Sequence, residues 1–312
     1  MLFEVPILFL IFNREDTTQR VFDTIRLQKP KYLYVAADGA RKDRQGEAEK
    51  CRRVRDIIKQ VDWNCEVKTL FREENLGCKI AVSTAITWFF EQVDYGIILE
   101  DDCLPDASFF PFCEELLVRY KEDDRVGHIG GNNFFPGIVL KELSYDFCSI
   151  SHIWGWASWR RVWQNYDANF LYWNEARNNR NKRKSLFKNL REEIYFSSFI
   201  SDTLAGNKGI DTWDVQYLYM LRVQNQLSIY PAVNMVTNIG IDSTSVTHKI
   251  SRKTEKFIAQ AQLIEFPLKH PSYLMANYSI DSLTFRRIFF SYRRLLRFIL
   301  RFNTLRRSAG TR

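Results

Sequence analysis

The chain has 312 residues, 46% of them hydrophobic, which is enough for a sizeable globular core and argues against general disorder. Its formal net charge of +8 comes from one end, because residues 284–312 contain nine arginines, no lysine and no acid. The rest holds 36 basic and 37 acidic residues, so the positive charge describes the tail and not the fold.

The first twelve residues, MLFEVPILFLIF, are apolar but lack a basic n-region and a small-residue cleavage site. We therefore expect a first strand at this point and not a signal peptide. No window reaches the roughly 18 to 20 apolar residues of a membrane span. Six cysteines without a C-x-x-C pair indicate neither a zinc ribbon nor a disulfide framework. These features predict a soluble body with reduced thiols in the cytoplasm.

Apolar runs alternate with amphipathic segments through the first half of the chain. The expected strands are 5–12, 31–38, 65–71 and 95–102, and the expected helices are 16–27, 45–61 and 77–93. This β-α alternation predicts a Rossmann-like α/β fold, with a mostly parallel sheet and helices on both faces.

The second half of the chain is less regular. We expect aromatic loops at 152–163 (HIWGWASWRRVW) and helices near 186–204 and 211–223. Residues 177–191 hold seven basic residues without interleaved aromatics, which indicates a mobile loop or an exposed helix start and not a nucleic-acid partner. We divide the chain into a nucleotide-binding half (1–132), an acceptor-side half (133–283) and a basic tail (284–312).

Polar side chains follow four of the predicted strands. They are Asn13 and Arg14, Asp38, Arg72, and the triplet Glu100, Asp101 and Asp102. Because ligands of open α/β sheets bind outside the carboxyl ends of the strands, we expect these side chains to converge on one site.

The acidic triplet has two interpretations. It is either a solvated turn after a strand or a site for Mg²⁺ or Mn²⁺, since these cations prefer oxygen ligands and complete their shells with phosphates. Strand alternation predicts that Glu100 and Asp102 share one side and that Asp101 lies on the other.

Several segments, in chain order, resemble one enzyme family. They are PILFLIFNR, YVAADG, KIAVSTAITWFF, IILEDDCLPDASFFPF, HIWGWASWRRVW, TWDVQYLYM and NMVTNIGIDSTSVTHK. Together they are similar to sugar-nucleotide glycosyltransferases of the GT-A fold, in particular the N-acetylglucosaminyltransferase I group with its E-D-D variant of the D-x-D motif. The resemblance covers roughly residues 5 to 250, and Val215 departs from it where the family has a second aspartate.

The resemblance implies roles for individual residues. The residues implied in nucleotide-sugar binding are Arg14 at the phosphates, Asp38 at the nucleobase, Lys79, Glu100, Asp101 and Trp156. The implied metal ligands are Asp102 and His248, and the implied catalytic base is Asp214, with Asp211 in reserve. Plain structural interpretations also stay open: a turn for Asp38, a helix start for Asp214, a buried loop for Trp156 and a solvated loop for His248.

The resemblance predicts an inverting glycosyltransferase that uses Mn²⁺ or Mg²⁺ and moves a sugar from a nucleoside-diphosphate donor, such as a UDP-sugar, to a glycan or lipid-linked acceptor in surface polysaccharide synthesis. One alternative is a sugar-nucleotide pyrophosphorylase, although the glycine-rich phosphate loop of that class is replaced here by NREDTTQR. Another is a non-catalytic protein that binds membranes or nucleic acid.

The basic tail, 284–312, shows apolar side chains on one side of a helical projection and arginines on the other. This pattern suits the headgroup boundary of an anionic membrane. It would place the protein peripherally on the inner face of the cell membrane. A terminal helix packed on the protein's own core is the other interpretation.

Overall fold

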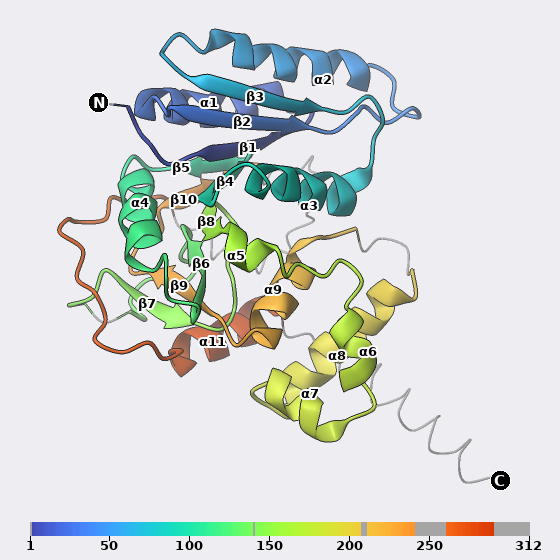
Figure 1. Ribbon diagram of the computed structural model, residues 1–312, viewed down its shortest axis with the longest axis vertical. Helices are drawn as coiled ribbons and strands as arrows, with labels where there is room; N and C mark the ends of the chain where they lie inside the picture. Colours follow the sequence, from blue (N-terminus) through green and yellow to red (C-terminus); the bar gives the residue numbers. More distant parts are fainter. Residues whose placement is uncertain (1, 140, 207–210, 241–259, 290–312) are drawn as a thin grey trace.

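The computed structural model describes residues 2–139, 141–206, 211–240 and 260–289. Strands of both halves of the chain share one mixed sheet in the order β3-β2-β1-β4-β8-β6-β9-β7 (Figure 1). These strands are β1 (Ile7–Ile11), β2 (Tyr32–Ala37), β3 (Glu66–Phe71), β4 (Tyr95–Glu100), β6 (Val126–Gly130), β7 (Tyr145–Cys148), β8 (Trp156–Trp159) and β9 (Leu227–Pro231). A small second sheet pairs β5 (Cys103–Pro105) with β10 (Val236–Asn238).

Helices surround the large sheet and form a separate group at one end of the molecule (Figure 1). They are α1 (Glu15–Gln28), α2 (Glu47–Asp56) continued by η1 (Ile57–Gln60), α3 (Gly77–Phe90), α4 (Phe109–Arg119), α5 (Arg160–Trp163), α6 (Leu171–Ala176), α7 (Arg180–Leu186), α8 (Leu190–Leu204), α9 (Asp214–Val223), α11 (Tyr278–Thr284) and the short π-helical segment η2 (Phe285–Phe289). None of the helices in the described residues is long and apolar enough to cross a membrane.

The order of the parallel strands reverses between β1 and β4. The chain moves outward from β1 to β2 to β3 and then returns to place β4 on the other side of β1. Because such crossovers are right-handed, this reversal places α3 on the face opposite α1 and α2. The prediction of a Rossmann-like α/β fold is confirmed.

The buried parts of the inner parallel strands β1 and β4 are apolar because helices cover both of their faces. All five residues of β1 are buried, as are the four residues of β4 between Gly96 and Leu99. β3, at the edge of the sheet, is only partly buried. The apolar runs of the sequence therefore correspond to the central strands.

The expectation of an aromatic loop at 152–163 is wrong in its second half. Residues Trp156 to Trp159 form β8, which pairs antiparallel with both β4 and β6 in the middle of the sheet. The polar Ser158 is accommodated there because its hydroxyl donates to the carbonyl of Gly127. A four-residue strand with two tryptophans has no clear alternation, so its pattern does not distinguish it from a loop.

A second hydrophobic core lies beneath α6, α7, α8 and α9, with Phe170, Trp173 and Phe196 among its buried members. The beginning of the basic tail packs on this core. Phe285 is 3% exposed and its ring contacts those of Tyr195 and Phe196. The rest of the tail, 290–312, lies outside the described residues.

Candidate functional site

The carboxyl ends of β1 and β4 lie side by side at the reversal of strand order. Leu10 of β1 is in register with Glu100, the last residue of β4. The residues that follow each strand therefore meet at the position where open α/β sheets bind their ligands.

An ion pair joins the two strand ends. Nη1 of Arg14 lies 2.8 Å from Oδ2 of Asp102, and the Asp102 side chain is 13% exposed. Burial opposes the charge on Arg14, but Asp101 and Asp102 outweigh it, so the pKa of Arg14 is raised. The guanidinium is thus held as a fixed positive charge in an acidic surrounding.

The two other acids of the triplet are crowded. Burial, followed by the charges of Asp102, Asp101 and Asp214, raises the pKa of Glu100 well above its usual range. Burial and then Asp102 raise the pKa of Asp101 to about 7, against the opposing effect of Arg14. The site therefore carries more negative charge than Arg14 compensates, and additional positive charge there would be stabilising.

Only the first acid of the triplet belongs to a strand, so the expected division of the three acids between two sides of a strand stays a prediction. β4 ends at Glu100, and Asp101 and Asp102 form a turn, so strand alternation stops before them. The Asp101 carboxylate accepts a hydrogen bond from the amide of Phe12 at 3.1 Å, just before Arg14. The negative charges of all three acids raise the pKa of Arg14.

Backbone from a distant segment covers the ion pair. The amide of Ile239 donates to the carbonyl of Asp102 at 2.7 Å. A Cβ on Gly240 would lie 2.3 Å from Nη1 of Arg14 and 2.4 Å from Oδ2 of Asp102, so only glycine fits. The resemblance placed this segment at the site, but the sequence did not single out Gly240.

Two of the predicted site residues hold the start of α3. The Asp38 carboxylate accepts hydrogen bonds from the amides of Leu76 and Gly77, with distances of 3.0 to 3.1 Å. Asp211 accepts from the amides of Cys78 and Lys79 at 2.8 and 3.0 Å. Both carboxylates therefore satisfy backbone donors at a helix N-terminus, and their roles in catalysis or nucleobase binding stay predictions.

Asp214 begins α9 and lies close enough to Glu100 to raise its pKa. The hydroxyl of Thr212 donates to its carboxylate. Cys78, which the sequence did not indicate, lies close enough to Glu100, Asp211 and Asp214 for their negative charges to act on its thiol. The structure thus brings Asp214 to the same site as the triplet.

Trp156 lies in a different environment from the one that the sequence predicts. Trp156 is 1% exposed and stacks on His128 and Trp213, so its ring presents no face to a sugar, because β8 is a central strand. His248 lies outside the described residues. The backbone amide of Lys79 donates a hydrogen bond to the carboxylate of Asp211.

The site fits a divalent cation by the chemistry of its donors, which are carboxylate oxygens. In the part of the chain that the structure describes, no group of three or more His, Cys, Asp and Glu side chains is arranged to hold a metal alone. Mg²⁺ is commonly held by one or two carboxylates together with substrate phosphates, so Asp102 and Glu100 would suffice.

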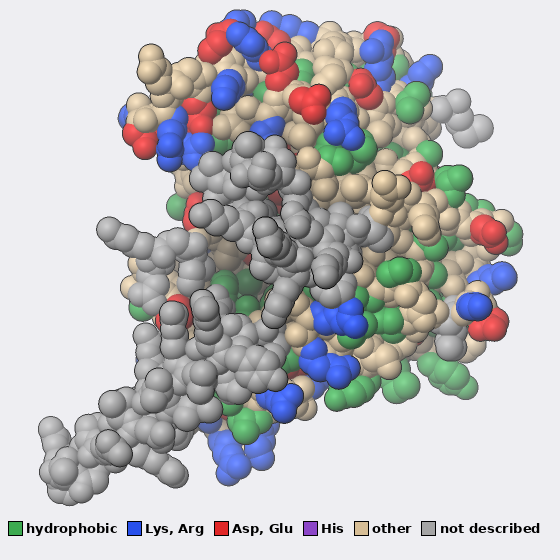
Figure 2. All heavy atoms as spheres, turned by 180° about the vertical axis from the view of Figure 1, so that it is seen from behind, with side chains coloured by type: hydrophobic (Ala, Val, Ile, Leu, Met, Phe, Trp, Pro, Cys, Tyr) green, Lys and Arg blue, Asp and Glu red, His purple; other side chains and the backbone are tan. Residues whose placement is uncertain are grey.

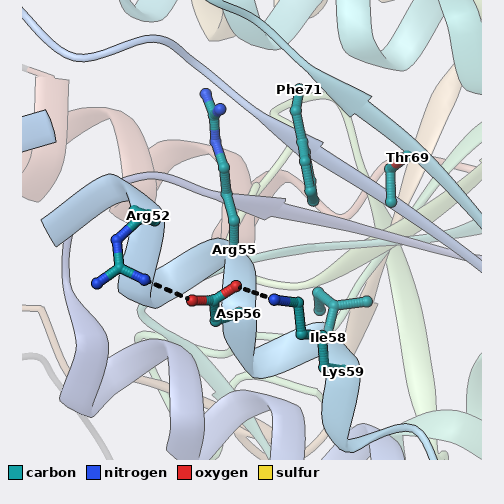
Figure 3. Close-up of a pocket in the computed structure, with 7 residues that line it drawn as sticks. All are labelled: Arg52, Arg55, Asp56, Ile58, Lys59, Thr69 and Phe71. Atoms are coloured by element: carbon teal, nitrogen blue, oxygen red, sulfur yellow. Dashed lines mark hydrogen bonds and ion pairs between the residues drawn. The ribbon is translucent and has the colours of Figure 1, made fainter. Parts of the chain in front are cut away.

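A cavity of about 370 Å³ lies elsewhere, between α2, η1 and β3. In Figure 3, the side chains of Arg52 and Lys59 both reach Asp56, and Arg55 extends toward Phe71. Arg55 also donates to the carbonyls of Asp38 and Arg72. These cations are bound to the protein's own groups, so this cavity is not the candidate site.

No family model and no curated protein matches the chain. Solved structures that match part of the chain include HddC from Yersinia pseudotuberculosis, at 10% identity over 52% of this chain and 80% of that one, with a TM-score of 0.32. A 4-diphosphocytidyl-2C-methyl-D-erythritol synthase from Anaerococcus prevotii shares 9% identity over 62% and 84%, with a TM-score of 0.30. A putative glucose-1-phosphate thymidylyltransferase from Bacillus anthracis shares 8% identity over 51% and 74%, with a TM-score of 0.30.

These names correct the prediction of an inverting glycosyltransferase. The matched structures are named as a thymidylyltransferase, a diphosphocytidyl-compound synthase and HddC, and none is named as a member of the N-acetylglucosaminyltransferase I group. The alternative to that prediction, a sugar-nucleotide pyrophosphorylase, fits them better.

Proposed function

We propose that the chain is a metal-dependent nucleotidyltransferase that joins a nucleotidyl group, taken from a nucleoside triphosphate, to a sugar phosphate. The observation that supports this best is the position of Arg14 beside Glu100, Asp101 and Asp102, at the reversal of strand order. A fixed cation and hard oxygen ligands at that position suit the phosphates of a nucleotide.

The reaction requires charge neutralisation more than proton transfer. An oxygen of the sugar phosphate forms a bond to the α-phosphorus while the bond to the pyrophosphate oxygen breaks, and pyrophosphate leaves with the electron pair. The attacking oxygen is already an anion, so no general base is needed. Arg14 would stabilise the charge on the phosphates.

The cation would be Mg²⁺ or Mn²⁺, held by Asp102 and Glu100, and when bound it would supply positive charge at the phosphates. Asp101 would support the end of β1 through the amide of Phe12. Within this proposal Asp38 and Asp211 position the start of α3, and Asp214 adds negative charge beside Glu100. The segment after β1 departs from the pyrophosphorylase class, since NREDTTQR is not glycine-rich.

The test is release of pyrophosphate. The full-length protein is incubated with Mg²⁺ or Mn²⁺, a panel of nucleoside triphosphates and a panel of sugar 1-phosphates. We expect one pair of substrates to give pyrophosphate and a nucleotide sugar, and Asp102→Asn to lose most of that activity while Asp62→Asn, an exposed acid on the surface, keeps it. No product from any pair, or full activity in Asp102→Asn, would overturn the proposal.

The basic tail, 284–312, is proposed to contact an anionic membrane. The boundary at residue 132 is proposed to separate nucleotide binding from recognition of the second substrate. Deleting the arginine charges of the tail should leave pyrophosphate release from soluble substrates unchanged, which separates the two proposals.

A further inference from the structure

A second cavity, of about 490 Å³, is a groove between the start of α8 and α11. It lies at the end of the molecule where α7, α8 and α11 are found, well away from α1 and α2 (Figure 1). Three cations line it: Lys188, Arg191 and Arg286. Lys and Arg side chains also gather at this end of the molecule in Figure 2.

The acids of the groove are buried and paired. Asp281 is 1% exposed, pairs with Lys188 and accepts from the amide and hydroxyl of Ser149. Glu192 is also 1% exposed and pairs with Arg222 at 3.0 Å. Both carboxylates are thus buried, whereas the side chains of Arg191 and Arg286 on the rim of the groove are exposed.

The helix terminus itself is not the binding feature. The side chain of Asn189 already accepts hydrogen bonds from the amides of Arg191 and Glu192 and so caps α8. The cationic and apolar side chains of the rim are therefore the binding feature.

Two large apolar side chains stand beside these cations. Leu190 is 66% exposed and Tyr278 is 68% exposed, and both line the groove. Cationic groups next to an exposed aliphatic and an exposed aromatic residue are the combination that binds the headgroup boundary of anionic membranes. Free phosphate would use the cations but would gain nothing from Leu190 and Tyr278.

We propose that this groove binds the phosphate headgroups of anionic lipids and docks the protein on an anionic lipid surface. The chain that follows α11 and η2 is also positively charged, since residues 290–312 contain seven arginines and no acid. The proposal differs from the membrane role of the tail, because only Phe285 and Arg286 of the groove belong to residues 284–312 and the other lining residues precede the tail. It is also independent of the proposed nucleotidyl transfer.

The experiment is flotation of the full-length protein with phosphatidylcholine vesicles, with and without phosphatidylglycerol. We expect binding only with phosphatidylglycerol. The double variant Arg191→Glu/Arg286→Glu should reduce the partition coefficient by roughly thirtyfold or more, since each lost cation near an anionic surface accounts for about a factor of five and each added glutamate is repelled by the surface. Leu190→Ser/Tyr278→Ser, which changes exposed side chains only, should reduce it severalfold with unchanged thermal unfolding.

Two further variants of the full chain serve as controls. Arg20→Glu/Lys50→Glu makes the same charge change on α1 and α2, where both side chains are exposed, and should bind like the wild type. Replacing Arg293, Arg294, Arg297 and Arg301 by glutamine tests the tail, and the groove variants should weaken binding in that background too.

Several outcomes would overturn the proposal. They are equal binding to neutral vesicles, wild-type binding by both groove variants, and binding that the tail substitutions alone abolish. Saturable binding of inorganic phosphate that is lost in Arg191→Glu/Arg286→Glu, without any vesicle binding, would show a site for free phosphate instead.

Discussion

The charge of Asp101 should destabilise the folded protein at neutral pH. Its carboxyl is buried, and burial together with Asp102 raises its pKa from 3.8 to about 7. Between these values the folded protein binds more protons than the unfolded chain, so the free energy of unfolding falls as the pH rises from about 4 to about 7. This direction is opposite to that of an ordinary salt-bridged aspartate.

The substitution Asp101→Asn removes this penalty and keeps the side-chain oxygen that accepts from the amide of Phe12. The difference between a pKa of 3.8 and one of about 7 corresponds to at most about 4 kcal/mol. Arg14 loses one attractive neighbour in the variant, so we expect a net stabilisation of roughly 2 to 4 kcal/mol at about pH 8 and little change at about pH 4.

The assay is urea unfolding of both proteins at these two pH values, without divalent cations. Asp23→Asn, which changes an exposed acid of α1, is the control and should alter stability by less than about 0.5 kcal/mol at either pH. If Asp101→Asn destabilises the protein at high pH, or changes its stability equally at both pH values, the reasoning about crowded acids is refuted.

Three other changes test the site. Gly240→Ala should weaken binding of a Mg²⁺-nucleotide at least tenfold, because the added Cβ displaces the Arg14–Asp102 pair. The overpacking should also cost about 1 to 3 kcal/mol of stability. An unchanged nucleotide affinity in calorimetric titration would contradict this prediction. Arg14→Gln should weaken nucleotide binding at low salt more than at high salt, and an affinity with the same salt dependence as the wild type would count against a phosphate contact. Asp211→Ala should lower the free energy of unfolding by about 1 kcal/mol or more, since two backbone amides of α3 lose their acceptor. Hydrogen exchange of the amides of Cys78 and Lys79 should become faster, and an unchanged exchange rate would contradict the contact.

The first half of the fold could be predicted from its sequence because local pattern decides it. Strands buried on both faces are continuous apolar runs, and the polar residues that end them converge at one sheet edge, as Arg14 and Asp102 do. β8 could not be predicted in this way, since its four residues form a strand by pairing with β4 and β6, which are distant in sequence.

The roles of individual acids also depend on distant partners. Asp38 and Asp211 follow or precede suitable elements, yet both accept hydrogen bonds from amides of residues 76–79, a pairing that no local pattern contains. Gly240 is near the site only because β10 pairs with β5 directly after the triplet. Sequence spacing can therefore locate the site, but the choice of hydrogen-bond partners follows from the tertiary fold.

Nucleotide binding beside Arg14 and Asp102 can be tested directly in a crystal structure of the full-length protein grown with Mn²⁺ and the nucleoside triphosphate that binds most tightly. We predict an anomalous manganese peak between the nucleotide phosphates and the carboxylates of Asp102 and Glu100, with the phosphates in contact with Arg14. A nucleotide and metal bound at another part of the molecule, with the Arg14–Asp102 pair undisturbed, would contradict the account.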